Sequence, residues 1–315
     1  MKKTITNSII DIAGKHLGKT SDGKTMQRYE APDHKDESLL VPIPRAFGRE
    51  KSNITPSFVG YDAWHAFEFS YLTENGMPVT GVLKLSYPST SENMVESKSL
   101  KLYLNSFDFD KYAGGIENSS TEVCKVIEKD LANVLGVQTP TDIKVHLHRA
   151  PKTNPDNCLD IFKAKGWKSL DTMDIHIDKF EEDPSLLEHK INSKPATVFK
   201  YYTVNLRSNC EITNQKDTGC CYIYMKGDYN PMPSELAKYI FSMRNSQHFH
   251  ENVTEIIYDT LLNRFEPNHL LVCSLYNRRG GLDIHPVRAT DRETIDKVLN
   301  WYDNPLILHK KTLQS

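Results

Sequence analysis

The chain has 315 residues, enough for one large domain or two of ordinary size, and we expect two. Its 39 lysines and arginines nearly balance its 41 aspartates and glutamates, which leaves a formal net charge of −2 at pH 7. This balance provides no overall field for holding nucleic acid or an acidic membrane, so the composition favours a small-molecule partner.

Cysteine usage and hydropathy predict a soluble protein of the reducing cytoplasm. The six cysteines form no C-x-x-C pair and no spacing typical of a disulfide framework: Cys124, Cys158, Cys210, Cys220, Cys221 and Cys273. Lys2 and Lys3 precede no long apolar stretch, and no run of residues reaches the length of a membrane span.

The first half of the chain begins with a polar segment, residues 1–50, in which we expect a loosely held N-terminal arm. The periodicity that follows predicts the order strand, strand, helix, helix, strand. The segments are residues 61–72, 78–87, 96–105, 121–135 and 142–148. Asn75-Gly76 is typical of a hairpin turn between the two strands, and Gly136 is typical of a helix end.

The second half repeats this order of elements. Strands are predicted at residues 198–206 and 220–226. Helices that begin near Pro231 and His250 follow, and then two strands around Gly280-Gly281. The segment between the halves is rich in Pro, Asp, Lys and Asn, which is typical of a long connector, and we expect a strand in it near residues 173–177.

These patterns predict an α+β fold with two modules, each an antiparallel sheet with two helices on one face. The predicted parts are an N-terminal arm at residues 1–50, a first module at 51–150, a connector at 151–196, a second module at 197–292 and a C-terminal tail at 293–315. Small sheets with open edges usually associate to cover them, so we expect a homodimer.

The stretch Ser208–Asp217 joins two predicted strands and is rich in turn-forming polar residues, so Cys210 is expected on a loop with rigid flanks. A thiolate is a good nucleophile, and the carboxyl group of Asp217 can take its proton and later return it to an intermediate. The alternative is that Cys210 is a small buried hydrophobe, a common environment of free cysteine.

Three further motifs carry charged or small residues, and each also has an ordinary structural interpretation. Glu96-Ser97-Lys98-Ser99-Leu100-Lys101 opens a predicted helix, where backbone N–H groups and lysines favour anions, or it is a solvated face. Phe249-His250-Glu251 also begins a helix, where Glu251 would simply complement the N-terminus and Phe249 would join the core. Arg278-Arg279-Gly280-Gly281 is a tight turn that approaches a ligand, or a hairpin with exposed arginines.

Taken in their order along the chain, the four motifs resemble those of the NADPH-dependent 7-cyano-7-deazaguanine reductases. These are the nitrile reductases of queuosine biosynthesis, a tRNA modification pathway. The resemblance implies tandem tunnelling-fold modules. It also implies the four-electron reduction of the nitrile of a deazaguanine to a primary amine, with two NADPH per turnover and no metal. Nucleic acid is then not a direct partner.

The resemblance assigns a role to each motif. Cys210 would add to the nitrile as a thioimidate, Asp217 would donate protons and His250 would relay them. The residues implied in substrate binding are Val95, Glu96, Ser97, Phe249, His250 and Glu251, with Glu251 accepting two N–H groups of a guanine-like edge. The residues implied in NADPH binding are Ser97, Lys98, Arg279 and Gly280.

The sequence departs from the family pattern at Glu211, Thr218 and His285, and a glutamate beside the nucleophile would tend to raise the pKa of the thiol. Two other functions stay open. One is a zinc-dependent cyclohydrolase of the same fold, although Thr213 stands where a C-x-x-H ligand pair would place its histidine. The other is a non-catalytic module that binds a purine-like ligand.

Overall fold

The computed structural model describes residues 32, 34–137, 142–149, 159–173, 175–192, 198–212, 214–300 and 302–310. In the first half, the main elements follow the predicted order, with short additions. They are η1 (Glu37–Leu39), β1 (Pro42–Pro44), α2 (Arg45–Lys51), β2 (Val59–Thr73), β3 (Pro78–Pro88), β4 (Asn93–Val95), α3 (Ser97–Asn105), β5 (Lys111–Tyr112), α4 (Gly115–Leu135) and β6 (Lys144–Arg149).

The second half also follows the predicted order. Its elements, with those of the connector and tail, are β7 (Leu159–Asp160), β8 (Lys168–Ser169), η4 (Pro184–Leu186), β9 (Lys190–Asn192), β10 (Val198–Asn209), β11 (Lys216–Lys226), β12 (Tyr229–Pro231), α5 (Pro233–Ser242), η5 (Met243–Asn245), α6 (His250–Phe265), β13 (His269–Tyr276), β14 (Leu282–Ala289), α7 (Arg292–Val298) and β15 (His309–Lys310). The strand expected near residues 173–177 is wrong, because residues 173 and 175–177 form none and β8 pairs with β10 instead.

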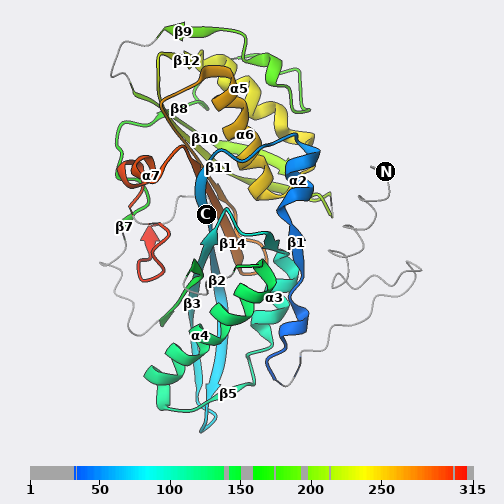
Figure 1. Ribbon diagram of the computed structural model, residues 1–315, viewed down its shortest axis with the longest axis vertical. Helices are drawn as coiled ribbons and strands as arrows, with labels where there is room; N and C mark the ends of the chain where they lie inside the picture. The colour runs from blue at the N-terminus through cyan, green and yellow to red at the C-terminus, as the bar shows by residue number, and fades with distance from the viewer. Residues whose placement is uncertain are drawn as a thin grey trace, which may run out of the picture.

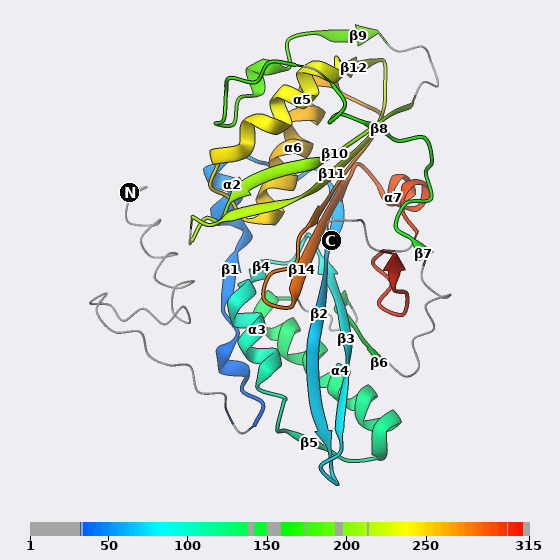
Figure 2. The ribbon, with the colours of Figure 1, turned by 180° about the vertical axis from the view of Figure 1, so that it is seen from behind.

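The two modules share one sheet. Within the described residues, nine strands form it in the order β6-β3-β2-β14-β13-β11-β10-β8, with β5 paired to β2 off this path. The modules join where β14 pairs antiparallel with β2, from Leu282 opposite Ala66 to Ala289 opposite Val59. Figures 1 and 2 show α3 and α4 over one end of the sheet and α5 and α6 over the other, on the same face. The predicted α+β class with two modules is confirmed.

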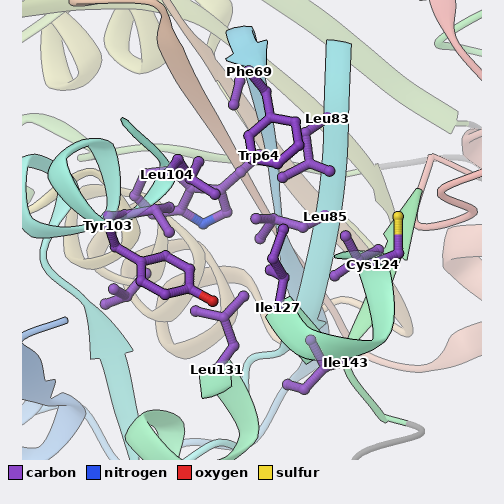
Figure 3. Close-up of a cluster of buried hydrophobic side chains, with 14 of the residues drawn as sticks. Trp64, Phe69, Leu83, Leu85, Tyr103, Leu104, Cys124, Ile127, Leu131 and Ile143 are labelled. Carbon is purple, nitrogen blue, oxygen red and sulfur yellow. The ribbon is translucent and has the colours of Figure 1, made fainter. Parts of the chain in front are cut away.

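The helices bury apolar stripes against the sheet. On α4, Val123, Ile127 and Leu131 recur at a spacing of four residues and are fully buried, as a 3.6-residue period requires. They meet Trp64 and Leu83 of β2 and β3 in the cluster of Figure 3. Gly136 ends α4 in the left-handed conformation, with φ of 67°. None of the helices in the described residues combines the length and the apolar character that a membrane crossing requires.

Segments from both ends of the chain pack on this frame. β1 pairs with β4, and Gly48 of α2 lies so close to the Asn252 side chain of α6 that a Cβ there would come within 2.1 Å of it. Near the other end, the backbone carbonyls of Asp303 and Ile307 accept hydrogen bonds from β3, at 3.0 Å from Ser86 and 2.7 Å from Lys84.

Candidate active site

A pocket lies at the seam between the modules, beside the N-terminal ends of α3 and α6. Every predicted site residue except Gly280 lines it: Val95, Glu96, Ser97, Lys98, Cys210, Asp217, Phe249, His250, Glu251 and Arg279. These residues come from five segments of the chain, so the fold gathers the four predicted motifs around one cavity.

Cys210 begins the turn of a hairpin. The strands are longer than expected, since β10 extends to Asn209 and β11 begins at Lys216. The turn is closed by the hydrogen bond from the Cys210 N–H to the Gln215 carbonyl, 2.8 Å long. Ser208 and Asp217 are directly opposite in the register, so strand alternation brings Cys210 and Asp217 out on the same face of the hairpin.

Asp217 contacts the side chains of His250 and Arg279. Its Oδ1 lies 3.1 Å from Nε2 of His250 and 2.9 Å from Nη1 of Arg279. The His250 ring stacks on Tyr276, with ring centroids 3.8 Å apart, which fixes its orientation. The carboxyl group of Asp217 is thus paired with the imidazole of His250, and both line the same pocket as Cys210.

Glu251 is buried at the start of α6, with only 5% of its surface exposed. Burial raises the pKa of Glu251 to about 7, and the Asp62 carboxylate adds to this, while His250 and Arg45 oppose it. No ion pair among the described residues includes Glu251. Its carboxyl group is therefore available to a ligand in the pocket.

The start of α3 differs from the expectation that it offers free backbone N–H groups. Glu96 caps the helix: its carboxylate accepts hydrogen bonds from the N–H groups of Lys98, at 3.0 Å, and Ser99, at 2.7 Å. An anion at this end would have to rely on side chains. Ser97 and Lys98 are exposed, and no ion pair within the described residues involves Lys98.

The Gly-Gly motif forms the β13–β14 turn. Gly280 and Gly281 have φ of 55° and 82°, which glycine adopts at little cost, and Arg279 and Leu282 exchange two backbone hydrogen bonds across it. Gly280 lies beside the pocket, where an added Cβ would come within 3.0 Å of the Lys101 Nζ. Arg278 stacks over Phe67, with its guanidinium carbon 4.3 Å from the ring centroid, and it is not among the residues that line the pocket.

Sequence reasoning missed one wall of the pocket. Ile43 of β1 and Met94 of β4 line it and belong to a small apolar cluster against which Ile212 and Phe249 pack. The signal was present in Leu40–Arg45, because its alternating prolines and aliphatic residues indicate an extended, partly buried strand.

The departures from the family pattern have local partners. Glu211 forms an ion pair of 2.6 Å with Lys51, which offsets its charge beside Cys210. Thr218 bonds Asn277 through its side chain at 2.9 Å. His285 lies with His65 around Asp283 on the face of the sheet away from Trp64.

We also searched the described residues for clusters of side chains that could bind a metal ion. Among the described residues, two groups of three have a spacing that could hold a metal ion: His65, Asp283 and His285, and Glu188, His189 and Glu235. Neither group includes Cys210. Both histidines of the first group instead hydrogen-bond one carboxylate, with Nδ1 of His65 at 2.7 Å and Nε2 of His285 at 3.3 Å from Oδ1 of Asp283.

The sequence matches known proteins over most of its length. A family model described as nitrile reductase, 7-cyano-7-deazaguanine-reductase N-term matches residues 31–146, and one described as QueF-like protein matches residues 233–294. The chain is 35% identical over 279 residues to the NADPH-dependent 7-cyano-7-deazaguanine reductase of Coxiella burnetii, covering 87% of this chain and 91% of that one. It is 37% identical over 288 residues to the enzyme of the same name from Colwellia psychrerythraea, covering 88% and 93%.

The solved structures that match include a crystal structure of the archaeosine synthase QueF-Like in the apo form. It is 16% identical, the match covers 31% of this chain and 94% of that one, and the TM-score is 0.27.

Proposed function

Because the chain belongs to the NADPH-dependent 7-cyano-7-deazaguanine reductases, we propose that its pocket reduces the nitrile of 7-cyano-7-deazaguanine to the aminomethyl group in queuosine biosynthesis. The observation that supports this most directly is the meeting of Cys210, Asp217, His250 and Glu251 in one cavity at the seam of the modules. The chemistry follows from what each side chain can do there.

Cys210 is the proposed nucleophile. Addition of its sulfur to the nitrile carbon forms a C–S bond, and the nitrogen takes up a proton, so the adduct is a thioimidate on the protein. The carbon of this adduct accepts a hydride more readily than a nitrile does. The position of Cys210 at the start of a short hairpin turn, partly buried and lining the pocket, suits a side chain that must form and release a covalent bond.

Asp217 is the proposed proton donor to the nitrogen, and His250 its relay. The support is their 3.1 Å contact and their common access to the cavity. Replacing Asp217 by Asn removes the acidic proton and keeps the shape. We expect Asp217→Asn to form the adduct slowly and to lose turnover, which mass spectrometry of the intact protein and an NADPH assay would separate. Full activity in Asp217→Asn would contradict the assignment.

Glu251 is the proposed recognition residue for the base. One carboxylate can accept the ring N–H and the neighbouring amino group of a guanine-like edge together. Its burial excludes competing water, and Phe249, which packs on the apolar wall formed with Ile43 and Met94, provides a surface for the ring system. Val95, Glu96 and Ser97 complete this proposed side of the substrate site.

NADPH supplies the hydrides, and because reduction of a nitrile to an amine takes four electrons, we propose two NADPH per turnover. The chain offers cationic groups at the pocket that fit its phosphates: exposed Lys98, and Arg279, of which one nitrogen is used by Asp217. Ser97 and Gly280 are proposed neighbours of the cofactor. The proposed site uses no metal.

We also propose that the chain divides at residues 50, 150, 196 and 292 and that it forms a homodimer in the cytoplasm. It makes no direct contact with nucleic acid in this proposal.

The test is NADPH oxidation by the purified protein on adding 7-cyano-7-deazaguanine, with the amine quantified in the same samples. Two NADPH consumed per amine formed is the expected result. A mass increase equal to one substrate without oxidation would place the defect in hydride delivery. Reversible binding of the base with no NADPH oxidation and no mass increase would favour the purine-binding alternative. Stoichiometric zinc in the purified protein would favour the cyclohydrolase.

A further inference from the structure

A buried cluster of charges lies behind Glu251, outside the proposed catalytic groups. Arg45, at the start of α2, is 2% exposed, and its Nη2 lies 2.5 Å from Oδ2 of Asp62 on β2. Asp62 also accepts from Arg288 of β14 at 2.9 Å, and Arg288 bonds Glu255 of α6 at 3.0 Å. Arg49 closes the series on Glu255 at 2.9 Å. The cluster therefore ties α2, both seam strands and α6 together.

The charges of this cluster balance only if Glu251 is counted. Arg45, Arg49 and Arg288 carry three positive charges, and Asp62 and Glu255 carry two negative ones. An ionised Glu251 is the third negative charge. In a buried region an uncompensated charge is costly, so the surplus positive charge favours the carboxylate form of Glu251.

The geometry places the surplus next to Glu251. Glu251 and Glu255 are one turn apart on the same face of α6, and α2 docks on that face through the close approach of Gly48 to Asn252. Within the described residues, Nη1 of Arg45 is buried and donates to no hydrogen-bond partner. Arg45 thus has unused hydrogen-bonding capacity, and its charge is one of those that act on the buried carboxyl group of Glu251.

We propose that Arg45 is a positioning residue for base recognition: its guanidinium, anchored on Asp62, favours the ionised form of Glu251, which can accept both N–H groups of the substrate. This inference rests on the proposed function, since it concerns how the same pocket selects a guanine-like edge. Arg45 itself need not touch the substrate.

The proposal makes a signed prediction about pH. Several elements contribute ionisable groups around Glu251: His250 and Glu255 from α6, Asp62 from β2, Arg45 from α2, Arg288 from β14, and the buried phenols of Tyr87 and Tyr276. The pKa of Glu251, about 7, lies above its ordinary value, and binding needs the carboxylate. Substrate affinity is therefore present above pH 7 and declines as the pH falls below it.

Two substitutions should move this decline in opposite directions. Arg45→Met removes a positive charge, which raises the pKa of Glu251 further and shifts the loss of affinity to higher pH. Asp62→Asn removes a negative charge, which lowers that pKa and shifts the loss to lower pH. For a shift of about one pH unit, the Kd rises about fivefold at pH 7 in Arg45→Met and falls about fivefold at pH 6 in Asp62→Asn. Damage to the fold would weaken binding in both.

The experiment is calorimetric titration with 7-cyano-7-deazaguanine from pH 5.5 to 9, in a Cys210→Ala background where binding is reversible. Arg45→Lys, which keeps the positive charge, should restore the profile of the parent. Arg49→Met is the comparison variant, because it removes an arginine of the same cluster that pairs with Glu255 and not with Asp62, and it should move the profile less than Arg45→Met does. Thermal unfolding of each variant reports structural damage separately.

The outcomes distinguish the two proposals. If the wild-type protein neither reduces nor binds the nitrile, the proposed function fails. If it does both, and Arg45→Met and Asp62→Asn keep the parent's pH profile or move it in the same direction, the role of Arg45 is overturned while the function stands.

Discussion

The helices α4 and α6 hold equivalent places in the two modules, and they are used differently. α4 exposes its first turn, residues 115–118, and buries an apolar stripe of Val123, Ile127 and Leu131 against the outer part of the sheet. α6 is buried from Glu251 to Tyr258, polar residues included, and packs on β13 and β14 beside the seam (Figure 1).

This difference shows what the seam adds to a repeated design. A helix at the end of the sheet has solvent on one side, so it needs only one apolar face. A helix beside the seam is covered by α2 as well as by the sheet, so Glu251 and Glu255 are removed from water and must be balanced by charges from other segments. Glu251, the proposed recognition residue, is thus buried in the first turn of α6, whereas the first turn of α4 in the other module is exposed to solvent.

The largest effect on turnover is expected for Cys210, which lines the pocket, and none is expected for Cys124 on α4. Cys210→Ala should abolish the covalent adduct and lower turnover by at least about 10³-fold, because no other group supplies the nucleophile. Cys124→Ala on α4 is the control: burial raises the pKa of Cys124 to about 12, so its thiol is unreactive. It should cost about 1 kcal/mol of stability and leave turnover of the folded protein unchanged. Adduct formation in Cys210→Ala would refute its role.

The next effect compares the first acidic residue of each helix. Glu251→Gln keeps the shape but offers one acceptor in place of two, so we expect the KM for 7-cyano-7-deazaguanine to rise about 10- to 100-fold. Glu117→Gln on α4 changes an exposed residue that pairs with Arg149, and it should change neither the KM nor the stability measurably. Equal KM values in the two variants would remove the functional contrast between the helices.

A smaller effect is expected for the cofactor. Lys98→Glu places a negative charge near the proposed phosphate site and should raise the KM for NADPH about 5- to 10-fold, with the KM for the nitrile little changed. Lys125→Glu, an exposed charge reversal on α4, controls for net charge. Steady-state kinetics at two salt concentrations would check the assignment, and an unchanged KM for NADPH would contradict it.

The smallest effect concerns the cap of α3. Glu96→Ala removes the acceptor for the N–H groups of Lys98 and Ser99 and should lower the free energy of unfolding by about 1 kcal/mol. Urea unfolding followed by circular dichroism measures this. Stability equal to that of the parent would mean that the cap adds nothing to the first module.

Local patterns predicted much of the fold. Asn75-Gly76 marked the β2–β3 hairpin, and the four-residue spacing of Val123, Ile127 and Leu131 marked α4. Errors came where tertiary contacts overrode local pattern. No strand forms at the described residues 173 and 175–177, and β10 pairs with β8, residues 168–169. α4 begins at Gly115, ahead of the apolar stripe that defined its predicted start at Thr121.

The sequence by itself determined the elements and the motif residues, because turn chemistry and periodicity depend on neighbours a few positions apart. Only the tertiary structure decided how they meet. The pairing of β2 with β14 merges two sheets into one and makes the seam, and Arg45, Asp62, Glu255 and Arg288 find one another across as many as 226 positions of sequence. Charge balance in a buried site acts through space, so no local pattern could reveal which arginine accompanies Glu251.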